Sequence, residues 1–230
     1  MGEKVYLKLY ELSRLLLNFF VFNVIWFILT IPMWVVVFQL FLIEDTASLY
    51  ILVPILTLLL PFVFFPPTQA LFATMREIII QDDWIHVKVF FTFYTSSFKN
   101  SLIAGILFTG LAISLSYSIY LSWQLNLILM IVLAVILFYL FLFGLYFFFM
   151  ESHFDMNLGW KLKQALVFVM GHPVSSIGNF LLFVFIHFVV WSVSPVISFL
   201  IGMALTSYFS IYLFMRKMNK LVERKTETAK

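Results

Sequence analysis

The sequence contains no cysteine, and this absence removes several kinds of chemistry. Without a thiol the chain has no disulfide, no thiolate metal ligand, no cysteine nucleophile and no lipid attached through cysteine. Charged residues are scarce as well: they make up only 11% of the sequence, against roughly a quarter in soluble domains. With 63% hydrophobic residues as well, the composition is typical of a protein that lies within a membrane.

Six long uncharged stretches account for most of the 230 residues. A helix needs about 20 apolar residues to cross a bilayer, so six stretches leave little chain for a separate soluble domain. We therefore predict an all-α fold, a polytopic membrane bundle of about six transmembrane helices that forms a single domain over residues 1–230. The predicted spans are residues 15–43, 47–75, 102–123, 125–150, 177–191 and 196–215, with a basic tail over 216–230.

Two polar connections separate these spans on one side. Residues 76–100 carry charges and a run of aromatic residues, which is typical of a segment at the membrane surface. Residues 151–176 place Lys161 and Gln164 opposite a row of leucine and valine residues, the spacing of an amphipathic helix that ends at Gly171. The pattern suggests three helical hairpins, each preceded by an interfacial helix; alternatively, these loops are simply where charged residues can lie.

All 14 lysine and arginine residues fall on the same side of the predicted spans. Short loops rich in these residues are retained in the cytoplasm, so both termini should be cytoplasmic in a multi-pass protein of the cell membrane. This charge should contact the lipid bilayer, and we expect no binding of nucleic acid. The basic residues before, between and after the spans are Lys4, Lys8, Arg14, Arg76, Lys88, Lys99, Lys161, Lys163, Arg216, Lys217, Lys220, Arg224, Lys225 and Lys230.

Motifs for catalysis or metal binding are missing. The sequence has no H-E-x-x-H zinc helix, no G-x-S-x-G turn and no glycine loop for phosphate. The spans hold no charged residue and only one histidine, His187, which is more typical of packing than of a proton relay. Glu151, His153 and Asp155 form a polar group that solvation at the interface would explain. We therefore predict no enzyme, no catalytic residue, no metal and no cofactor.

Proline and amide residues within the first two spans are the remaining candidates. Pro66 and Pro67 remove backbone donors, which predicts either a kink that ends the span or a broken helix that lines a substrate site. Asn23 and other polar residues of the first span can bond neighbouring helices or, alternatively, bind a sugar-like ligand.

Several segments together resemble the YesL family of bacterial membrane proteins, which has a domain of unknown function. These segments are Asn23 with Trp26 and Pro32, then PPTQALFATMR over 66–76, Phe90 with Phe91, SFKNS over 97–101, KLKQAL over 161–166, and His172 with Pro173. The resemblance implies a role in carbohydrate uptake, because such proteins are usually encoded beside ABC-type sugar importers and sugar-responsive sensor kinases.

The resulting hypothesis is a non-enzymatic accessory or regulatory protein for oligosaccharide uptake, which partners an ABC sugar permease or a sensor kinase. The alternative is a facilitative carrier of a sugar-like solute in its own right. The candidate ligand or packing site comprises Asn23, Trp26, Pro32, Pro66, Pro67 and Gln69. The candidate cytoplasmic partner surface comprises Arg76, Lys99, Asn100, Lys161, His172 and Pro173.

Overall fold

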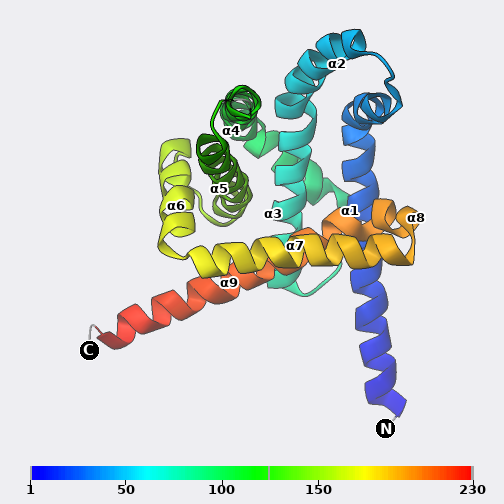
Figure 1. The fold of residues 1–230 in the computed structure, drawn as a ribbon. Helices are drawn as coiled ribbons and strands as arrows, with labels where there is room; N and C mark the ends of the chain where they lie inside the picture. The colour runs from blue at the N-terminus through cyan, green and yellow to red at the C-terminus, as the bar shows by residue number, and fades with distance from the viewer. Residues whose placement is uncertain (1, 124, 229–230) are drawn as a thin grey trace.

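The computed structural model describes residues 2–123 and 125–228, and within these residues the chain is helical with no strand (Figure 1). Gln124 and residues 229–230 of the predicted tail lie outside the described residues. The helices, with η for a π-helix, are α1 (Gly2–Leu42), α2 (Thr46–Leu59), η1 (Leu60–Phe64), α3 (Phe65–Gln81), α4 (Val87–Ser122), α5 (Leu127–His153), α6 (Leu158–Gly171), α7 (Pro173–Val193), α8 (Pro195–Ile197), η2 (Ser198–Gly202) and α9 (Met203–Thr228).

Six helical segments among the described residues are long and apolar enough to cross a membrane. The second consists of α2, η1 and α3 in direct succession, and the sixth consists of α8, η2 and α9. The predicted fold class, an all-α polytopic bundle, is therefore confirmed, and the chain is a multi-pass membrane protein. Figure 1 shows both ends of the chain on the side opposite α2.

Of the three expected interfacial segments, only the third is a helix of its own. The first forms the start of α1, which runs without interruption through the first span. The 76–100 connection is divided between the end of α3, a short loop and the start of α4, so it does not form one surface segment. The third is α6, which begins at Leu158 and ends at Gly171. Helices α1 and α4 are therefore much longer than a bilayer requires.

The second span neither ends nor opens at Pro66 and Pro67. These prolines occupy the first turn of α3, where a missing N–H costs least, and the π-helix η1 lies directly before them. Phe65 N–H donates to the Leu60 carbonyl, so the wider turn maintains hydrogen bonding across the junction. Both sequence interpretations, a terminating kink and a broken helix, were wrong because a π-turn accommodates proline while the helix continues.

Polar residues cap the end of α3 and the start of α6. Asp82 ends α3 in the left-handed conformation with φ 47°, and its N–H donates to the Ile78 carbonyl at 3.0 Å. Arg14 of α1 forms ion pairs with Asp82 at 3.1 Å and with Asp83 at 3.2 Å. Asn157 caps α6 by accepting a hydrogen bond from Trp160 N–H at 2.8 Å. These contacts fix the loop after α3 against α1.

The core lies where α3, α4 and α5 pack together, and it is mainly aromatic. Phe72 of α3 stacks on Phe148 of α5 with 5.5 Å between the ring centroids. Phe149 stacks on Phe214, which brings α9 to the same core. Helices α7 and α9 contact each other and cross the view in Figure 1 at a steep angle to α1. This core positions the polar groups of the candidate site.

Candidate functional site

A buried ion pair joins α5 to α6 at the end of the aromatic core. Glu151 Oε2 lies 3.0 Å from Lys161 Nζ, and the two side chains are only 4% and 5% exposed. The other carboxylate oxygen of Glu151 accepts a hydrogen bond from Asn100 Nδ2 of α4 at 3.0 Å. Because an unpaired charge is very costly inside a protein, this geometry fixes three helices relative to one another.

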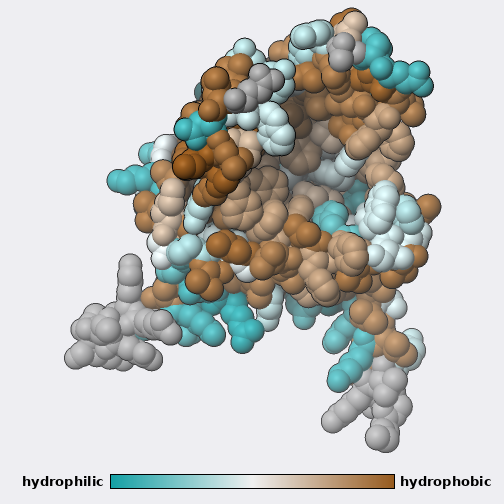
Figure 2. All heavy atoms as spheres, in the orientation of Figure 1, coloured by the Kyte–Doolittle hydropathy of each residue, from teal (hydrophilic) through white to brown (hydrophobic). Residues whose placement is uncertain are grey.

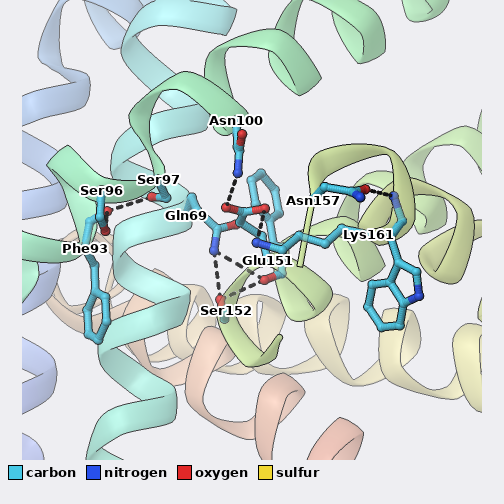
Figure 3. A network of polar contacts seen from close by, with 11 residues as sticks. Gln69, Phe93, Ser96, Ser97, Asn100, Glu151, Ser152, Asn157 and Lys161 are labelled. Atoms are coloured by element: carbon cyan, nitrogen blue, oxygen red, sulfur yellow. Dashed lines mark hydrogen bonds and ion pairs between the residues drawn. The ribbon is translucent and has the colours of Figure 1, made fainter. Parts of the chain in front are cut away.

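Helix α3 joins the same network through Gln69 (Figure 3). Gln69 Nε2 donates to Ser152 Oγ at 2.9 Å, and Ser152 Oγ donates to the Phe148 carbonyl at 2.7 Å. Gln69 is buried, and its Oε1 has no hydrogen-bond partner among the described residues. We call Gln69, Asn100, Glu151, Ser152 and Lys161 the polar network; it connects α3, α4, α5 and α6.

The sequence interpretation of Glu151 and Lys161 was wrong. Lys161 was expected on the polar face of an amphipathic helix, and Glu151 was expected to be solvated. In the structure Lys161 lies on the buried face of α6 with Ala165, Phe168 and Val169. A lysine can occupy this face because Glu151 neutralises it there. No local pattern within 158–171 indicates that the carboxylate lies beside it.

The other residues of the predicted partner surface do not form one continuous surface. Lys99 is exposed, whereas Asn100 is committed to Glu151. Arg76 is mostly buried; its Nη1 lies 3.4 Å from the Glu77 carboxylate, and its Nε donates to His153 Nδ1 at 3.4 Å. His172 is half-buried at the junction of α6 and α7, and Pro173 starts α7.

The predicted ligand site is divided among separate contacts. Asn23 Nδ2 donates to the Phe199 carbonyl at 2.6 Å, and Asn23 Oδ1 accepts from Ala204 N–H at 2.7 Å. Trp26 Nε1 donates to Thr68 Oγ1 at 3.0 Å. Pro32 is exposed on α1, so it does not join the others.

Pro66, Pro67 and Gln69 are buried in the first turns of α3. Of these three residues, only Gln69 belongs to the polar network. The site predicted from the sequence is therefore not one cavity.

The structure holds instead a cavity of about 770 Å³ between the α2–α3 segment and the α4–α5 pair. Its walls are almost entirely aromatic and aliphatic, with Phe65, Phe108 and Phe148 among them. Figure 2 shows this part of the molecule as a hollow with hydrophobic walls. Five lining residues carry hydroxyl groups, and of these Thr109 Oγ1 is buried with no hydrogen-bond partner among the described residues. They are Thr57, Thr68, Thr109, Ser116 and Tyr117. A polar motif could not have located a site of this composition.

The arrangement of the polar network supports holding helices together more than it supports a reaction. Ser152 donates its hydroxyl proton to the Phe148 carbonyl and accepts a hydrogen bond from Gln69. Glu151 is occupied by Asn100 and Lys161 on its two oxygens. Among the described residues, no group of three histidine and acidic side chains is placed to hold a metal ion.

One comparison with known proteins gives a match. Residues 19–119 match the family model described as "Protein of unknown function, DUF624". The matched region runs from within α1 to near the end of α4, so it includes Gln69 and Asn100 but not their partners on α5. No curated protein and no solved structure matches the chain.

Proposed function

We propose that the chain is a non-enzymatic accessory or regulatory protein associated with oligosaccharide uptake in the bacterial cell membrane. Its partner in this proposal is an ABC sugar permease or a sensor kinase. The observation that carries the proposal is that the buried amide and charged side chains described above contact other helices. Asn23, Gln69, Asn100 and the Glu151–Lys161 pair are all committed in this way.

The link to sugar uptake rests on the resemblance to the YesL family, and the DUF624 match is consistent with that resemblance. In such a protein the basic loops and both termini face the cytoplasm, because lysine and arginine lie on that side. The partner then meets the cytoplasmic face, where α6 lies.

The outward face of α6 is the part of that side best suited to contact a partner. Leu166, Val167 and Met170 are exposed there, while Lys161 and Phe168 hold the opposite face against the protein. Exposed apolar residues on a firmly held helix form a rigid surface, which lowers the entropy cost of binding. The same face is open to lipid, so a partner would displace lipid from it.

A facilitative carrier is the alternative, and the cavity argues against it. A sugar presents many hydroxyl groups, and its site needs polar partners that replace water. The 770 Å³ cavity offers mainly aromatic and aliphatic walls, and Gln69 and Asn23 do not line it. The accessory role therefore accounts better for where the polar side chains lie.

Co-purification from the native host grown on plant oligosaccharides tests the proposal. The tagged protein is extracted in mild detergent, and its partners are identified by mass spectrometry. We expect an ABC permease or a sensor kinase in near-stoichiometric amount, and less of it with the L166A/M170A double variant. The I128A/V132A variant on exposed residues of α5 is the matched control.

Recovery of the protein alone, together with sugar flux into liposomes that contain only this chain, would overturn the proposal and establish a carrier. Equal loss of the partner from both double variants would exclude α6 as the contact surface and would leave the accessory role to another surface.

A further inference from the structure

A second pocket, distinct from the polar network and from the apolar cavity, lies between α5, α7 and the middle of α9. Its volume is about 500 Å³. Arg216, Lys217 and Lys220 line it from α9, and their spacing of three and four residues places them on one face of that helix. We call it the basic pocket.

The basic pocket gathers positive charge without an acidic residue in its lining. No aspartate or glutamate lines the pocket, and none of its three cations has an ion-pair partner among the described residues. This contrasts with Lys161, whose charge is matched at 3.0 Å. An anion is therefore the complementary ligand.

Polar side chains of α5 and α7 also line the basic pocket. Asn179 is buried, and its Nδ2 donates to the Ser210 carbonyl at 3.1 Å. The Tyr146 side chain interacts with Asn179 and lines the same pocket together with Ser175. Hydroxyl groups both donate and accept hydrogen bonds, so this wall suits a ligand that carries hydroxyl groups of its own.

The position of the basic pocket points to a lipid as the source of this anion. Arg216 follows directly on the apolar stretch 196–215, and the candidate spanning helix runs on only to Leu221, so the cations lie in the last turns of that helix. Leu213 and Phe214 form an apolar part of the wall beside them. Cations next to apolar residues at this depth match the phosphate and the acyl chains of one lipid molecule.

We propose that the basic pocket binds the headgroup of an anionic glycerophospholipid that carries hydroxyl groups, with phosphatidylglycerol as the representative. Its phosphate lies among Arg216, Lys217 and Lys220, and its headgroup hydroxyls bond to the polar wall that includes Tyr146 and Ser175. This binding does not depend on the proposed role in sugar uptake.

Gly178 permits a test that leaves every charge in place. It lines the pocket, and a Cβ built on it meets no atom within 4 Å, so there is open space for the first atom of a larger side chain at the pocket wall. Gly110 of α4 also has open space around its Cβ position but does not line the pocket. G178L and G110L are thus a matched pair of variants.

Native mass spectrometry of the full chain in detergent measures the binding. Phosphatidylglycerol and phosphatidylcholine with identical acyl chains are titrated against the wild type and each variant. We expect phosphatidylglycerol to bind at least about tenfold more tightly than phosphatidylcholine, because each surface cation adds about fivefold in affinity for an anionic lipid. K217Q should bind phosphatidylglycerol about fivefold more weakly than the wild type. G178L should lose most of the preference for phosphatidylglycerol over phosphatidylcholine.

Two controls separate the pocket from general attraction to basic residues. K99Q removes an exposed cation outside the pocket, and G110L adds bulk elsewhere; both should bind like the wild type. Glycerol 3-phosphate in solution should compete only weakly, because it lacks acyl chains for the apolar wall.

Several outcomes would overturn the proposal. Equal affinity for the two lipids would do so, as would a loss in K99Q as large as that in K217Q. A G178L protein that keeps its helix content and still binds phosphatidylglycerol like G110L would exclude the pocket. Strong competition by glycerol 3-phosphate would identify a soluble ligand instead of a lipid.

Discussion

The two halves of α5 are both strongly apolar, yet the protein buries only one of them. From Leu142 to Met150 most side chains are buried, whereas no residue of the first half, Leu127 to Phe141, is buried. The buried half lies beside the polar network, and both halves border the apolar cavity, through Phe141 from the first and Phe148 from the second. Lipid is as apolar as leucine, so hydrophobicity alone does not bring membrane helices together. Packing follows instead the polar contacts and the close helix approaches.

Breaking the Glu151–Lys161 ion pair beside the buried half of α5 should lower the free energy of unfolding more than any other variant below. Glu151→Gln leaves Lys161 buried without a counter-charge, which costs about 3–5 kcal/mol. Unfolding in mixed micelles monitored by circular dichroism measures the loss. The double variant E151Q/K161M removes the uncompensated charge and should restore most of the stability. An unchanged unfolding free energy in E151Q would contradict the central role of the pair.

Truncating one leucine in each half of α5 sharpens the contrast. Leu142 is fully buried, whereas Leu129 is 47% exposed on the same helix. Leu142→Ala should destabilise the protein by about 2–5 kcal/mol, and Leu129→Ala should stay within about 0.5 kcal/mol. The same unfolding assay applies to both variants. Equal losses would mean that the first half of α5 packs as tightly as the second.

Gly105 of α4 lies against η1 and the start of α3, and its substitution should give a smaller effect. A Cβ at this position would lie 2.9 Å from the backbone of Pro61 and 2.9 Å from the ring of Phe65. Gly105→Leu therefore forces α4 away from η1, at about 1–3 kcal/mol. Gly110→Leu on the same helix meets no such contact. If both variants unfold alike, α4 does not depend on this close approach.

The smallest effect on stability is expected at Asp45, which caps the start of α2 in the turn after α1. The Ser48 hydroxyl and backbone N–H donate to this carboxylate, which lowers the pKa of Asp45 below its usual value near 3.8. Because the folded pKa is the lower one, this cap stabilises the fold above pH about 4 and loses its contribution as the pH falls through the folded pKa. Nuclear magnetic resonance titration of the side chain measures the shift. Ser48→Ala should move the pKa of Asp45 back up.

The sequence predicted the membrane helices well, because length and apolar composition are sufficient to find them. It also located the end of α6 at Gly171, where His172 and Pro173 follow. It failed at Pro66 and Pro67, since hydropathy does not distinguish a π-turn from a break.

The polar network was beyond prediction for a different reason. Glu151 and Lys161 lie on different helices, and their contact depends on the turn over residues 154–157 between α5 and α6. Read separately, each looks like a solvated interfacial residue. Their burial follows from tertiary packing, which a single sequence does not display. The apolar cavity has no sequence signal either, because its walls resemble any other membrane-facing residues.

Asn23 of the first span can form its hydrogen bonds only after the last span has been synthesised. Its two hydrogen bonds go to Phe199 and Ala204, more than 170 positions later in the chain. When the first span leaves the ribosome and enters the membrane, neither partner has yet been translated. The amide must therefore rely on water, lipid or the insertion machinery until the last hairpin arrives. The first span therefore has its hydrogen bonds satisfied only when the final span is in place. In a chain truncated before residue 199 the Asn23 amide would stay without these partners, and we expect quality-control proteases to degrade that chain.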